Sequence, residues 1–131
     1  GVRHAYVVSG HDGMDEISLS GPTSVAEAVN GTVRLFEMRP EDFGFSPVPR
    51  EAILGGDAGD NARILRSVLE GKRGPCRDIV VLNAAPAIVA GRGAGTIEEG
   101  LRAAEDALDS GRALARLEAL IQFGAGPQSR C

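Results

Sequence analysis

The first third of the chain alternates between apolar and polar positions with the two-residue period of β-strands. Ala5–Ser9 is β-branched and aromatic and ends at a glycine, which is typical of a buried strand. The same alternation over 17–20 and over 25–29 predicts two further strands. Asn30-Gly31 then precedes another alternating run, Thr32–Met38. Because both central residues of a type I′ turn need a positive φ, Asn-Gly at this place predicts a β-hairpin.

After the hairpin the apolar residues recur with the period of amphipathic helices. Arg50–Leu54 is predicted to form one helical turn that Gly55-Gly56 stops. Asp57 is the predicted N-cap of the helix that follows. The segment 60–70 places its apolar residues on one stripe and ends at Gly71, which predicts a helix.

Two more helices are predicted near the end of the chain. Thr96 and Glu99 have the spacing of a capping box, so a helix begins there and runs to about Asp109. Ser110-Gly111 breaks this helix, and a last helix is predicted over Arg112–Phe123. Four apolar residues of the last helix are expected to face inward: Leu114, Leu117, Leu120 and Ile121.

The apolar segment Ile79–Ala90 has two interpretations. Ile79–Leu82 has the propensity of a strand, whereas Pro75 and Asp78 upstream are typical of the first turn of a helix. One buried helix over the whole segment is the second interpretation, with Pro86 removing a hydrogen bond and adding a kink. In either case strands come first and helices later, which fits one edge of a larger α/β sheet better than a complete doubly wound domain.

Composition narrows the class of protein. The 131 residues are 43% hydrophobic and 24% charged, as in one ordinary globular domain. A net charge of −4, with one Tyr, four Phe and no Trp, argues against a nucleic-acid partner. The longest apolar stretch is Ile79–Ala90, which is short of the ~20 residues that a membrane span needs. Cys76 and Cys131 form no disulfide framework, so a reducing, cytoplasmic location is expected.

The candidate chemistry lies in the loop 10–16, directly after the first predicted strand. This loop carries Asp12, Asp15 and Glu16 among two glycines and a histidine. Ligands of open α/β sheets bind at the carboxyl ends of strands, and adjacent carboxylates supply the hard oxygen ligands that Mg²⁺ prefers. The alternative interpretation is that these acids are solvated residues of a surface turn.

Four motifs occur along the chain in a characteristic order and spacing. They are G-H-D-G-M-D-E at 10–16, L-G-G-D-A-G-D-N-A at 54–62, R-D-I-V-V-L-N-A-A at 77–85 and D-S-G-R-A at 109–113. No single motif is specific, but together they resemble the carboxy-terminal part of the α/β domain of the anthranilate phosphoribosyltransferase family. The resemblance covers residues 1–123, and 124–131 are expected to form a flexible tail.

The resemblance implies a fold. The family has a small helical domain and a larger α/β domain with a mostly parallel sheet, similar to that of nucleoside phosphorylases. This chain would be the C-terminal part of the sheet domain, in which strands with the Asn30-Gly31 hairpin are followed by four helices. The resemblance also favours the helical interpretation of Ile79–Ala90.

The resemblance further implies a reaction and a metal. The family transfers a phosphoribosyl group from phosphoribosyl pyrophosphate to anthranilate in tryptophan biosynthesis, and Mg²⁺ stabilises the departing pyrophosphate. The ligand role falls on Asp15 and Glu16. The chain departs from the family's usual pattern at three positions, with Ser9 in place of His, Met14 in place of Leu and Pro86 in place of Ala.

The resemblance also defines the expected partners. The family's phosphate loop, its anthranilate contacts and its helical domain all precede the region resembled. The chain is therefore expected to need the missing N-terminal region of the same protein, to be inactive alone, and to form a homodimer only with the helical domain. Two alternatives remain. One is a pyrimidine-nucleoside phosphorylase-like enzyme. The other is a truncated, non-catalytic module or partner-binding remnant, whose exposed strand edge and apolar faces favour poor solubility or self-association.

Overall fold

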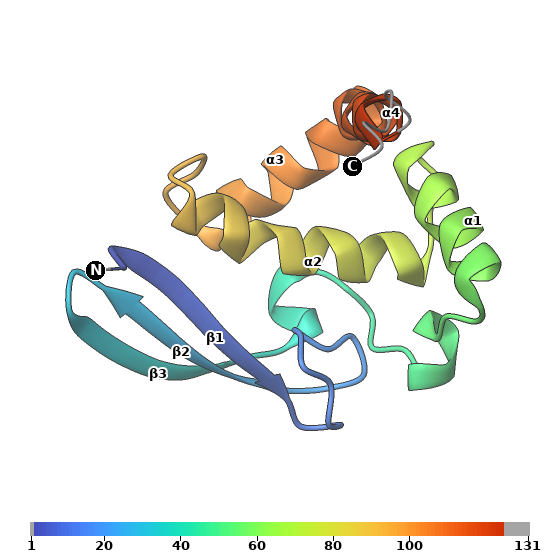
Figure 1. The fold of residues 1–131 in the computed structure, drawn as a ribbon. Coiled ribbons are helices and arrows are strands. Elements are labelled where there is room, and N and C mark those ends of the chain that lie inside the picture. Colours follow the sequence, from blue (N-terminus) through green and yellow to red (C-terminus); the bar gives the residue numbers. More distant parts are fainter. Residues whose placement is uncertain (1, 125–131) are drawn as a thin grey trace, which may run out of the picture.

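A three-stranded sheet lies against one long helix, and other helices lie on the far side of that helix and beside one of its ends (Figure 1). The computed structural model describes residues 2–124 of the chain. The strands are β1 (His4–Gly10), β2 (Thr23–Val29) and β3 (Thr32–Met38). They lie in the order β1-β2-β3, and both neighbouring pairs are antiparallel.

The predicted hairpin is confirmed. Val29 of β2 pairs with Thr32 of β3, so the turn between them is Asn30-Gly31. Asn30 has a φ of 49° and Gly31 a φ of 86°, which are the positive values that a type I′ turn requires. The turn thereby sets the register of the whole β2-β3 ladder.

The mostly parallel sheet implied by the resemblance is not confirmed. Every strand pairing among residues 2–124 is antiparallel, because β1 and β2 are joined by a loop that reverses the chain and β2 and β3 by a hairpin. Antiparallel neighbours need only such short connections, whereas parallel neighbours need a crossover.

The predicted strand over 17–20 is wrong. Ile17 and Leu19 are buried, but Ser18 between them is buried as well. The apolar and polar residues of this segment therefore do not point to a core face and a solvent face, as they would in a strand. Side chains take the place of a neighbouring strand: the Ser18 N–H donates to Thr23 Oγ1, and the Ser20 N–H donates to Ser18 Oγ. Short hydroxyl side chains compete in this way with ladder hydrogen bonds, and the segment forms an ordered loop.

Within residues 2–124 six helical segments follow the sheet, and those near 50–53, 58–69, 97–109 and 112–124 confirm the predicted helices. They are the 3₁₀ turns η1 (Pro40–Phe43) and η2 (Arg50–Ile53) and the helices α1 (Ala58–Leu69), α2 (Pro75–Ala90), α3 (Ile97–Asp109) and α4 (Arg112–Gly124). Asp57 caps α1 by accepting from the Asp60 N–H. At α3, Thr96 accepts from the Glu99 N–H, while the Glu99 carboxylate accepts from the Gly95 N–H instead of closing the capping box on Thr96.

Helix α2 settles the ambiguous apolar segment as helical. It is continuous from Pro75 through Pro86 to Ala90, and its buried residues include Leu82 and Ala85 at 0% exposure. It lies between the sheet and α3, so it is apolar on most sides (Figure 1). This burial explains why the segment lacks a helical period in sequence.

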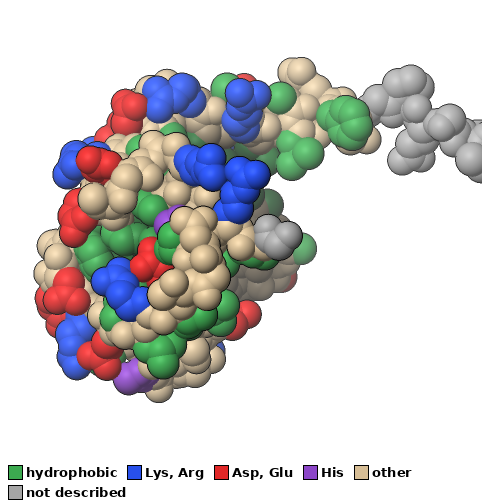
Figure 2. All heavy atoms as spheres, turned by 90° about the vertical axis from the view of Figure 1, so that its left-hand side faces the viewer, with side chains coloured by type: hydrophobic (Ala, Val, Ile, Leu, Met, Phe, Trp, Pro, Cys, Tyr) green, Lys and Arg blue, Asp and Glu red, His purple; other side chains and the backbone are tan. Residues whose placement is uncertain are grey.

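The expected inward packing of α4 is wrong for two of its four residues. Leu114 and Leu117 are half-buried, but Leu120 is 65% and Ile121 51% exposed. Figure 2 shows the end of α4 projecting from the rest of the molecule, with hydrophobic side chains on its surface. Only the start of α4 reaches other helices, so its apolar stripe continues past the surface that it packs on.

Two further observations concern the limits of the described part. Of the expected tail 124–131, Gly124 is the last residue of α4 and 125–131 lie outside the described residues. Within residues 2–124, no helix combines the length and the apolarity that crossing a bilayer would require.

Candidate functional site

The loop that joins β1 to β2 has a compact turn at its start. The Gly10 N–H donates to the Met14 carbonyl at 2.9 Å, and the Gly13 N–H donates to the Gly10 carbonyl at 3.0 Å. A Cβ on Gly10 would stand 2.6 Å from Asp12 Oδ1, so the turn leaves no room for a side chain at this position. The His11 N–H closes the loop on the Pro22 carbonyl at 2.9 Å.

Asp12 belongs to the framework of this loop. Its carboxylate accepts from the Ser18 hydroxyl at 2.6 Å and from the Met14 N–H at 3.2 Å. The hydrogen bond from Ser18, followed by that from Met14, holds the pKa of Asp12 below its usual value. Because its oxygens are occupied by these donors, Asp12 serves the loop's own structure.

Asp15 and Glu16 are arranged differently. Neither carboxylate has a hydrogen-bond or ion-pair partner among residues 2–124, and Asp15 is exposed while Glu16 is half-buried. Burial, and then the adjacent charge of Asp15, raises the pKa of Glu16. Two neighbouring carboxylates with free lone pairs and no counter-charge fit a hard divalent cation, which would supply that charge.

Asp15 and Glu16 would not by themselves complete the coordination shell of a metal ion. No group of three or more His, Cys, Asp or Glu side chains within the described range is close enough to hold a metal ion. Mg²⁺ is commonly bound by one or two carboxylates, with substrate phosphate oxygens and water completing the shell. For an ion bound in this way, the chain would offer two carboxylates, and the remaining ligands would come from elsewhere.

Helix α2 supplies a contact to this loop that the sequence pattern did not reveal. The Ile17 N–H donates to Asn83 Oδ1 at 2.8 Å, and Asn83 Nδ2 donates back to the Ile17 carbonyl at 2.8 Å. Asn83 is the lone polar side chain within the run 79–90. A single polar residue in an apolar run is the sequence signal for such a contact, because a half-buried amide needs hydrogen-bond partners.

The other candidate positions have structural roles. His11 Nε2 lies 2.9 Å from Ser24 Oγ at the start of β2, on an exposed surface. The pair Gly55-Gly56 precedes the Asp57 cap, as predicted, and the Gly56 N–H donates to Asn61 Oδ1 at 2.9 Å.

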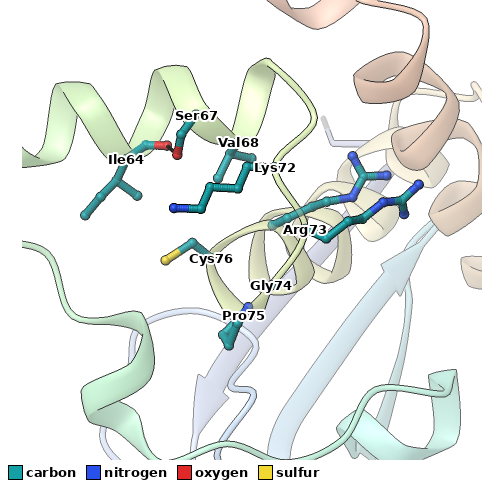
Figure 3. Close-up of a pocket in the computed structure, with 9 residues that line it drawn as sticks. Ile64, Ser67, Val68, Lys72, Arg73, Gly74, Pro75 and Cys76 are labelled. Carbon is teal, nitrogen blue, oxygen red and sulfur yellow. Dashed lines mark hydrogen bonds between the residues drawn. The ribbon is translucent and has the colours of Figure 1, made fainter.

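A separate pocket lies between the end of α1 and the start of α2. It has a volume of about 200 Å³, and Lys72 and Cys76 are among the residues that line it (Figure 3). Arg73 also lines it, and its guanidinium in Figure 3 points toward the neighbouring helices. Arg73 and Arg77 are both paired with the carboxylate of Asp109, at 3.2 Å and 2.9 Å. The pocket is therefore distinct from the acidic loop, and its two arginines share the charge of one carboxylate.

Comparison with known proteins identifies the family. Residues 1–114 match the family described as "Glycosyl transferase family, a/b domain". The chain belongs to this glycosyl transferase family. The match includes the whole sheet, the acidic loop and helices α1 to α3.

Among members of this glycosyl transferase family, the similarity to one enzyme is high. The chain is 54% identical over 123 residues to the anthranilate phosphoribosyltransferase of Rubrobacter xylanophilus, covering 93% of this chain and 36% of that relative. It superposes on the crystal structure of anthranilate phosphoribosyltransferase from Thermus thermophilus with a TM-score of 0.82 at 34% identity, covering 92% of this chain and 35% of the other.

A third similar structure is the Saccharomyces cerevisiae anthranilate phosphoribosyltransferase in complex with PRPP and Mg. Its TM-score is 0.78 at 30% identity, covering 88% of this chain and 33% of the yeast chain. The sequence therefore spans about a third of the length of the relatives that it matches (36% for the Rubrobacter enzyme).

Proposed function

We propose that residues 1–123 of this chain form the C-terminal portion of an anthranilate phosphoribosyltransferase. The complete enzyme transfers the phosphoribosyl group of phosphoribosyl pyrophosphate to anthranilate in tryptophan biosynthesis, in the cytoplasm. The 54% identity to the Rubrobacter enzyme over nearly the whole chain supports this assignment. The observation that carries it is the pair of carboxylates, unpartnered among residues 2–124, on a loop closed by backbone hydrogen bonds, at the place where the family motif predicts metal ligands.

We further propose that Asp15 and Glu16 bind Mg²⁺. When bound, the ion neutralises charge on the departing pyrophosphate. The yeast enzyme was solved with PRPP and Mg, which supports the choice of metal for this chain. The chain's own part is to hold the two carboxylates beside each other on a loop whose turn is closed by backbone hydrogen bonds.

The exposed surface of the chain supports a need for a further region of protein. On the sheet face away from α2, Val7 pairs in register with Ala26 and Ala26 with Leu35. Val7 is 69% and Leu35 77% exposed, and Val33 beside them is 63% exposed. An apolar patch across three strands is typical of a surface that another part of a protein covers.

We identify the covering region with the N-terminal part of the same protein, which would also bring most of the substrate site. The chain alone is accordingly expected to be inactive. The homodimer is expected to form only when the N-terminal helical domain is present.

The test is to complete the enzyme. The chain is fused behind the part of the Rubrobacter relative that precedes the matched region, and loss of anthranilate is followed with phosphoribosyl pyrophosphate and Mg²⁺. The fusion is expected to consume anthranilate. The double substitution Asp15→Asn, Glu16→Gln is expected to reduce turnover about 100-fold or more at moderate Mg²⁺, since direct ligands contribute at least as much as their supporting contacts.

Two results would contradict the proposal. A folded fusion that leaves anthranilate unchanged but cleaves uridine with phosphate would favour the nucleoside phosphorylase alternative. Unchanged turnover and unchanged Mg²⁺ dependence in the double variant would remove Asp15 and Glu16 from the metal site.

A further inference from the structure

The geometry points to Asn83 as a positioning residue for the Asp15-Glu16 pair. We propose that its side-chain amide, from the middle of α2, fixes the backbone of Ile17 and so sets where the two preceding carboxylates stand. This inference rests on the proposed metal role of Asp15 and Glu16. It concerns a residue that contacts neither carboxylate and acts through the backbone.

The contact is two-sided. Asn83 Oδ1 accepts from the Ile17 N–H, and Asn83 Nδ2 donates to the Ile17 carbonyl, both at 2.8 Å. One amide thereby satisfies both backbone groups of one residue, as a neighbouring strand would. The Ile17 side chain is 2% exposed, so its backbone is held from one side and its side chain is locked in the core.

The orientation of the amide is itself determined. Asn83 Nδ2 also donates to the Ile79 carbonyl of its own helix at 3.0 Å. Two carbonyl oxygens therefore face the nitrogen and one N–H faces the oxygen, so a flipped amide would lose all three hydrogen bonds. The helix thus presents a donor and an acceptor in a single arrangement.

A second anchor lies on the other side of the carboxylate pair. The Met14 N–H donates to Asp12 Oδ1 at 3.2 Å, and the Met14 carbonyl accepts from the Gly10 N–H at 2.9 Å. Met14 and Ile17 thus each have both their backbone N–H and their carbonyl hydrogen-bonded. Asp15 and Glu16 are the two residues between these anchors. The Met14 anchor is internal to the loop, whereas the Ile17 anchor ties the loop to the central helix.

This arrangement predicts a specific effect of losing Asn83. Without its amide both backbone groups of Ile17 lose their hydrogen bonds to α2, so this end of the carboxylate pair is held by side-chain packing and by the Ser18 backbone bond to Thr23. Contacts that orient metal ligands without touching the metal affect affinity by about 10- to 100-fold. A residue that matters only for folding would instead change stability without changing metal affinity.

The chain contains a matched control. Asn61 of α1 makes the same two-sided contact, accepting from the Gly56 N–H at 2.9 Å and donating to the Gly56 carbonyl at 3.2 Å. That contact supports the start of α1 and no part of the acidic loop. Asn61→Leu removes the same pair of side-chain-to-backbone hydrogen bonds at a place where metal binding should not respond.

The experiment measures Mn²⁺ binding to the completed fusion with phosphoribosyl pyrophosphate present, from the electron paramagnetic resonance signal of free Mn²⁺. Asn83→Leu is expected to raise the Mn²⁺ dissociation constant about 10- to 100-fold, and Asn61→Leu to leave it within about twofold. Asn83→Ser, whose hydroxyl is too short for the two-sided contact, is expected to behave like Asn83→Leu and covers the case in which the leucine variant does not fold. The Mg²⁺ concentration for half-maximal turnover should move in parallel.

The variants distinguish a failure of the positioning role from a failure of the metal site. If Glu16→Gln weakens Mn²⁺ binding while folded Asn83 variants bind normally, the positioning role is overturned and the metal site stands. Equal weakening by the Asn83 and Asn61 variants would likewise overturn it, since general loosening would then explain both. If Glu16→Gln and Asp15→Asn leave Mn²⁺ binding unchanged, the proposed metal site fails, and the positioning role fails with it.

Discussion

The crossing of α2 and α3 is so close that adding one methyl group to Gly100 should destabilise the protein. An ideal Cβ on Gly100 would stand 2.6 Å from the Ala85 carbonyl oxygen and 3.1 Å from its carbon. Both atoms belong to the α2 backbone, so no side-chain rotation relieves the clash. Gly→Ala inside a helix gains about 1 kcal/mol from propensity, whereas overpacking a core costs about 1–3 kcal/mol. Gly100→Ala is therefore expected to lower the free energy of unfolding by up to about 2 kcal/mol.

Gly59 of α1 provides the opposite case. Its nearest would-be contacts are side-chain atoms, Asp57 Oδ1 at 3.2 Å and Arg63 Nη1 at 3.6 Å, and no backbone atom of another element lies as close. Gly59→Ala is expected to change the free energy of unfolding by less than about 1 kcal/mol and not to lower it as Gly100→Ala does. Urea unfolding of the chain, followed by far-ultraviolet circular dichroism, compares the two variants. Equal stabilisation by both would refute the close α2–α3 packing.

Two further predictions concern ionic contacts. Asp109→Ala should destabilise the protein by about 3 kcal/mol in urea unfolding because it strands the buried guanidinium of Arg77, which is 2% exposed. Asp106→Ala, which breaks an exposed pair, should cost at most about 1 kcal/mol, and equal effects would contradict this contrast. The hydrogen bond from Tyr6, with further bonds from neighbouring basic groups, lowers the pKa of Glu27 from 4.5 to about 2. A depressed carboxyl pKa stabilises the fold above pH 4.5, so stability should fall between pH 4.5 and about 2. Acid titration of Glu27→Gln should lack that loss, and an unchanged profile would count against the cluster.

Local patterns in the sequence were sufficient where local chemistry decides the structure. The Asn30-Gly31 turn and the Asp57 and Thr96 caps depend on residues a few positions apart, and each is found where the pattern predicts it. The acidic loop was also found from sequence. Its division into Asp12, which holds the loop together, and the free carboxylates beyond it depends on Ser18, whose hydroxyl reaches back only in the folded chain.

The wrong predictions concern segments whose structure depends on contacts with distant parts of the chain. The alternation of Ile17 and Leu19 is that of a strand, but the backbone there bonds to Asn83 and to side chains of its own loop. Leu120 continues an apolar stripe along α4, yet no described element lies against it. The run 79–90 of the central helix lacks a clear period because both the sheet and α3 cover it, so within this run only the polar exception, Asn83, carried a signal.

The most direct test of the account is to locate the metal. The completed fusion is crystallised with phosphoribosyl pyrophosphate and Mn²⁺, and anomalous difference density is measured at the acidic loop. The account predicts a peak within about 2.0–2.3 Å of oxygens from Asp15 and Glu16, with Asp12 still bonded to Ser18. Density held by other residues, with both carboxylates facing solvent, would contradict the metal role of this pair.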